Sequence, residues 1–72
     1  MKAILEFNLP EDSQDFKLAN EAADWHLVAW EVDQKLRHFL KYGHEFKSVD
    51  EALEEIRKFL HEEISDRGLQ FQ

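Results

Sequence analysis

The fold depends on "DWHLVAWE", residues 24–31. Within it, the six consecutive residues 25–30 are apolar or aromatic, in a chain of which 35% is charged. A helix on a protein surface normally shows an apolar stripe on one side and polar residues on the other. This segment has no polar side. We therefore expect both of its sides to be covered in the folded protein.

The segment lies in the middle of a long predicted helix over residues 11–42. No Gly or Pro interrupts these residues, Pro10 suits the first helical position, and Gly43 is a natural end. At about 100° per residue, such a helix carries two apolar stripes on roughly opposite sides. One stripe consists of Phe16, Ala19, Ala23, Leu27 and Trp30, and the other of Trp25, Val28, Ala29, Val32, Leu36 and Phe39.

Two arrangements satisfy both stripes. Either the chain bends near residues 20–24 and forms two helices that fold onto each other, or one long helix is covered by different partners at its two ends. Both arrangements place Trp25 and Trp30 in the most buried region. Because one further helix covers only one stripe, we favour a self-associating homodimer. The residues expected in the core or the dimer interface are Trp25, Leu27, Val28, Trp30, Val32, Leu36 and Phe39.

The flanking segments predict three more elements. Residues 2–7 alternate between apolar and polar, which is typical of a half-buried strand, and the tail 69–72 alternates in the same way. Between them, "SVDEALEEIRKFLHEEISDRG" (48–68) predicts an amphipathic helix. Ser48 and Glu51 form its capping box, and Gly68 is its C-terminal cap. The expected fold is a single domain, 1–72, of the α+β class: mostly helical, with a short strand at each end.

Three segments carry a resemblance to known proteins. The opening "MKAILEFNLPED" (1–12), the central "AWEVDQKLR" (29–37) and "LKYG" (40–43) are similar in order and spacing to a group of small proteins encoded in tailed-bacteriophage genomes. These motifs are specific to the group but carry no chemistry. Members often have Gly near residues 20–23, which marks a turn. This chain has "NEAA" there, which favours a continuous helix.

Composition disfavours several functional classes. The net charge of −7 disfavours binding to duplex nucleic acid, and the absence of cysteine removes disulfides and the usual zinc frameworks. "HEEIS" (61–65) begins like a zinc-protease motif, but Ser65 replaces its second histidine. With no nucleophile and base in a recognisable pattern, we expect neither an enzyme, a cofactor nor a metal site. No apolar run is long enough to cross a membrane, and the resemblance implies the cytoplasm of an infected bacterium.

The segment 35–47 is the one locally basic region. Four Lys or Arg residues accompany a single Glu there, with aromatic side chains between them. Cations gather at helix C-termini because the helix dipole favours them, and basic and aromatic residues together also bind nucleotides. The candidate ligand or partner contacts are Arg37, His38, Lys41, Tyr42, His44 and Lys47.

Three functions remain open from the sequence. The first is a non-catalytic interaction protein that binds and modulates a host or phage protein, with counter-defence as one such role. The second is an oligomeric module that binds a small anionic ligand such as a nucleotide. The third is a structural accessory protein.

Overall fold

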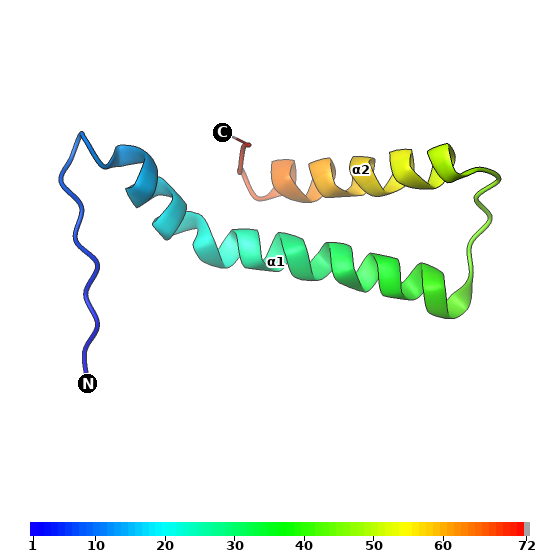
Figure 1. Ribbon diagram of the computed structural model, residues 1–72, viewed down its shortest axis with the longest axis horizontal. Coiled ribbons are helices and arrows are strands. Elements are labelled where there is room, and N and C mark those ends of the chain that lie inside the picture. Colours follow the sequence, from blue (N-terminus) through cyan, green and yellow to red (C-terminus); the bar gives the residue numbers. More distant parts are fainter. Residues whose placement is uncertain (72) are drawn as a thin grey trace.

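The computed structural model describes residues 1–71 and consists of two antiparallel helices. Helix α1 spans Ser13–Tyr42 (30 residues) and helix α2 spans Val49–Asp66 (18 residues). Figure 1 shows α2 lying alongside the C-terminal part of α1, while residues 1–8 extend away from the hairpin. The molecule is elongated, with extents of 50 × 29 × 17 Å.

The predicted α+β class is wrong, because residues 1–71 contain no strand. Residues 2–7 are extended but pair with no other segment, and their side chains are exposed apart from Phe7, whose ring meets Phe16 edge-on at 5.5 Å. Residues 69–71 are likewise not a strand, and residue 72 of the predicted tail strand lies outside the described residues. Alternation allows a strand, but a strand exists only where a neighbour accepts its backbone hydrogen bonds. Residues 2–7 and 69–71 do not pair with each other, so the only regular secondary structure within the described range is helical.

Helix α1 is a single unbroken helix. It begins two residues later than the sequence predicts, after a turn at residues 9–12, and it ends at the expected place. Gly43 has a φ of 91°, and its N–H donates to the carbonyl of Phe39 at 2.9 Å. The alternative of two helices folded onto each other is therefore wrong. Figure 1 shows only that the first turns of α1 slant away from the axis of the remainder.

Both predicted caps of α2 are confirmed. The hydroxyl of Ser48 accepts a hydrogen bond from the N–H of Glu51 at 3.1 Å, and the Glu51 carboxylate accepts one from the N–H of Lys47 at 2.9 Å. At the other end, Gly68 has a φ of 69°, and the N–H of Leu69 donates to the carbonyl of Ile64 at 3.0 Å. This pattern is a Schellman motif, and it turns Leu69 back onto the hairpin.

Removal of the Ser48 cap is expected to weaken the hairpin measurably. Ser48→Ala leaves the N–H of Glu51 without its side-chain acceptor, which costs about 1 kcal/mol. In a domain of this size, the cost lowers the melting temperature by about 4–8 °C. Thermal denaturation followed by circular dichroism measures the shift, and Ser48→Asp, which preserves an acceptor, should melt close to the wild type. A Ser48→Ala protein with an unchanged melting temperature would contradict the capping role.

The core is small and lies between the two helices at the end opposite the connecting loop. Val28 of α1 is 2% exposed and packs with Ile64 and Leu69, both also buried. Trp25 and Leu60 flank this cluster and are partly buried. Three buried apolar residues among the 71 described are few, because the free energy of folding depends on the apolar area removed from water.

Two charged side chains, Lys35 and Arg67, make further contacts in the hairpin. The ammonium group of Lys35 lies 5.5 Å from the ring centre of Phe39 and 5.2 Å from that of Phe59, so it joins α1 to α2. Near the other end, Arg67 forms an ion pair with Glu63, and this hydrogen bond raises the pKa of Arg67 above its ordinary value.

Candidate interaction surface

One side of α1 is not covered by α2. We call its apolar residues the outer stripe: Phe16, Ala19, Ala23, Leu27 and Trp30. Phe16 is 41% exposed, Leu27 45% and Trp30 51%, and both alanines are exposed as well. The reason is geometric. Val28 lies on the side of α1 that α2 covers, and Trp30 lies about 160° around the helix axis from Val28. The expectation that Trp30 lies in the most buried region is therefore wrong for the single chain.

The side of α1 that faces α2 carries the second predicted stripe. Val28 is buried, Trp25, Val32 and Phe39 are half-buried, and Leu36 lies at the exposed edge. The Trp25 ring also meets the ring of Phe71 at 5.7 Å, so the C-terminal turn helps to cover it. As the sequence predicts, α2 covers one of the two stripes and leaves the other exposed.

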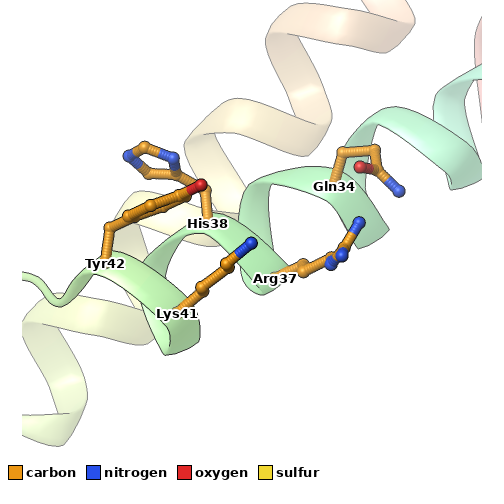
Figure 2. Close-up of a pocket in the computed structure, with 5 residues that line it drawn as sticks. All are labelled: Gln34, Arg37, His38, Lys41 and Tyr42. Atoms are coloured by element: carbon orange, nitrogen blue, oxygen red, sulfur yellow. The ribbon is translucent and has the colours of Figure 1, made fainter.

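A basic hollow lies at the C-terminal end of α1. Its volume is about 240 Å³, and its lining residues are Gln34, Arg37, His38, Lys41 and Tyr42 (Figure 2). The rings of His38 and Tyr42 lie 5.1 Å apart, and the Lys41 ammonium lies 5.3 Å from the Tyr42 ring centre. In Figure 2 the side chain of Arg37, which is exposed, extends toward Gln34.

The other two candidate contacts do not join this hollow. His44 and Lys47 belong to the connecting loop and line a separate depression beside Val49 and Leu53. The His44 ring packs on that of Phe46 at 4.9 Å, so it belongs to the loop's own aromatic contacts. Gln34 was missed by the sequence reasoning because it lies outside the basic segment. Its position, three residues before Arg37, is the signal that would have placed it on the same side of the helix.

The basic hollow and the outer stripe lie on the same side of α1. Residues 16, 19, 23, 27, 30, 34, 37 and 41 follow one another at intervals of three or four, which keeps them on one side of a helix. This surface is therefore continuous: it is apolar from Phe16 to Trp30 and becomes polar and basic from Gln34 to Lys41. We call it the outer face.

Within residues 1–71, the cations of the outer face form no ion pair. Among residues 1–71 the ion pair present is that of Arg67 with Glu63, and no carboxylate lies within ion-pair distance of Arg37 or Lys41. The N-terminal end of the same helix is acidic, with Glu11, Asp12 and Asp15 before or within its first turn. The surface of α1 is thus negative at one end and positive at the other.

The described residues place two limits on other sites. Within residues 1–71, no group of three or more His, Asp or Glu side chains is arranged to share a metal ion. Neither helix in that range combines the length and the apolar character that crossing a membrane requires.

What the outer face offers is contact area and charge. It combines exposed aromatic and aliphatic side chains with an adjacent basic region, which is the composition of a surface that binds another macromolecule. Comparison of the chain with known protein families, with curated proteins and with solved structures finds no match in any of the three.

Proposed function

We propose that the protein is a small, acidic, non-catalytic interaction protein that binds and modulates another protein through the outer face of α1. The observation that carries the proposal is the exposure of Phe16, Leu27 and Trp30 in one line. Monomeric proteins that work alone rarely expose a continuous apolar patch, because it promotes association. Tryptophan, moreover, is enriched among the residues that dominate binding energy at interfaces.

The resemblance to small tailed-bacteriophage proteins supports the choice of partner. On that basis the protein acts in the cytoplasm of an infected bacterium, and its target is a host or phage protein, including one of host defence. The acidity of the chain supports a target with a basic surface, because complementary charge accelerates and orients association.

The proposal includes self-association: in the free protein a second copy covers the outer face, and the target competes with that copy for the same face. The cluster of Val28, Ile64 and Leu69 is a weak core, and a symmetric homodimer would remove the outer stripe from water and enlarge the apolar interior. Sedimentation equilibrium at micromolar concentration tests this part, with a mass of two chains as the expected result. A mass of one chain without concentration dependence would contradict it.

Affinity capture from bacterial extract tests the binding of a target. The bait is the wild-type protein, and a second bait carries Leu27→Lys in the outer stripe. The matched control is Leu18→Lys, because Leu18 has a similar exposed fraction, 43%, but lies on another side of α1. A protein retained by the wild type and the control, and lost with Leu27→Lys, is the expected result. Equal retention by all three baits would place the binding surface elsewhere.

The second candidate function is binding of a small anion such as a nucleotide. The observation that favours it is the basic hollow: Arg37, Lys41 and Tyr42 line it, and the Lys41 ammonium lies 5.3 Å from the Tyr42 ring centre. The position of the hollow argues against anion binding. It lies at the C-terminal end of α1, where the helix dipole is negative and repels anions. Mass spectrometry of the purified protein separates the two functions, since a nucleotide that co-purifies supports the second.

A further inference from the structure

The outer face has an internal symmetry that bears on how two copies meet. The residues of the outer stripe are separated by three, four, four and three positions, so their spacing reads the same in both directions from Ala23. The symmetry continues one step further on each side, to Asp12 and Gln34, each four positions beyond the stripe. Such a pattern matches itself when a second, identical helix runs in the opposite direction.

We propose that two copies of the chain pair through the outer face with antiparallel α1 helices and a two-fold axis at Ala23. This inference rests on the self-association proposed above and specifies its geometry. In this arrangement Phe16 meets Trp30 of the second copy, Ala19 meets its Leu27, and the two Ala23 residues meet each other.

The sizes of the side chains fit this register. Alanine at the centre allows the helix axes to approach to about 8 Å, the short end of the usual range. Each small Ala19 side chain lies opposite a larger Leu27, which fills the space that two alanines would leave. At each end, Phe16 and Trp30 form an aromatic pair, and such pairs contribute more than their area alone.

The charges select the antiparallel direction. Side chains on a helix cover the surface about one turn toward its N-terminus, and Figure 2 shows Arg37 extending toward Gln34. The antiparallel register places Asp12 of the second copy opposite Gln34. Because the Arg37 side chain extends to that level, each Arg37 meets a carboxylate. A parallel pair would instead bring the two basic ends together, where like charges repel.

In this arrangement the acidic N-terminal turn of the second copy lies against the basic hollow. The cations that lack a counterion within residues 1–71 would obtain one from the acidic turn of the second copy, at both ends of the dimer. The hollow is then a dimer contact rather than a nucleotide site. A nucleotide that co-purifies in the hollow of an intact dimer would overturn this assignment.

Cysteine cross-linking tests the register directly, because the chain has no cysteine of its own. With axes about 8–10 Å apart and Cα atoms about 2.3 Å from each axis, facing Cα atoms at the two-fold axis lie close to disulfide distance. Ala23→Cys is therefore expected to form a disulfide-linked dimer under mild oxidation. Ala22→Cys, one position away and also exposed, is the matched control and should remain uncross-linked.

A mixture of Ala19→Cys and Leu27→Cys distinguishes antiparallel from parallel pairing. We expect the two variants to cross-link with each other and neither with itself. Cross-linking of each variant with itself would show a parallel pair and overturn the inference. A wild-type dimer by sedimentation, combined with no disulfide from Ala23→Cys, would also overturn it while leaving self-association intact.

Charge reversal gives a second measurement of the same geometry. Arg37→Glu places a carboxylate opposite Asp12 and is expected to raise the dimer dissociation constant roughly tenfold at low salt. The double variant Arg37→Glu with Asp12→Arg restores opposite charges and should recover most of the affinity. If the double variant dissociates as readily as Arg37→Glu alone, Arg37 does not face Asp12.

Discussion

Trp30→Glu is expected to convert the protein to a monomer without unfolding the helical hairpin. Trp30 is 51% exposed in the single chain, so its replacement removes little from the core around Val28. In the proposed dimer the same position lies against Phe16 of the second copy, where a carboxylate would be buried without a partner. Loss of a tryptophan contact at an interface can cost about 2–4 kcal/mol, and about 3 kcal/mol corresponds to a roughly 100-fold weaker association.

Two measurements separate dissociation from unfolding. Sedimentation equilibrium should give the mass of one chain for Trp30→Glu, while circular dichroism should show that most of the helix remains at low temperature. Leu18→Glu is the matched control, since it adds the same charge to an exposed position of α1 outside the outer face and should leave the dimer intact. A Trp30→Glu protein that remains dimeric with normal thermal stability would contradict the proposed interface.

Val28→Asp is expected to unfold the chain altogether. Val28 is 2% exposed and contacts the cluster that joins α1 to α2 and to the C-terminal turn. A carboxylate there loses its hydration and gains no hydrogen-bond donor, which costs several kcal/mol. The total stability of a chain of this length is on the order of 4–10 kcal/mol, so a loss of this size removes most of it.

Circular dichroism and thermal denaturation measure this second effect. We expect little helical signal and no cooperative transition for Val28→Asp. Ala29→Asp introduces the same side chain at the next position, which is exposed, and should melt within a few degrees of the wild type. A cooperative transition for Val28→Asp near that of the wild type would show that the Val28 cluster is not the core.

The helix boundaries could be predicted from the sequence because they depend on local interactions. Ser48 and Glu51 bind backbone groups within four residues of themselves, and Gly68 adopts a positive φ that other residues avoid. The two apolar stripes of α1 could also be derived from spacing alone. So could four of the five residues of the basic hollow, since successive turns of one helix place them together.

Two features could not be predicted in the same way: whether the alternating segments form strands, and which side of α1 is covered by α2. Residues 2–7 alternate as a strand does, but the described part of the chain, up to residue 71, provides no second strand to accept their hydrogen bonds, so these residues form an unpaired extended segment. Likewise, His44 lies in the basic segment, yet the loop turns its ring toward Phe46 and away from the hollow.

The sequence by itself determined that α1 has two apolar sides and that α2 is long enough to cover one of them. Only the tertiary structure decided which one. Ile64 and Leu60, with Leu69 folded back by the Gly68 turn, pack against Val28 and Trp25. This choice depends on how side chains from distant parts of the chain fit together, and periodicity within one helix carries no information about that fit. Because α2 takes the Val28 side, Trp30 and the outer stripe are left exposed for a partner.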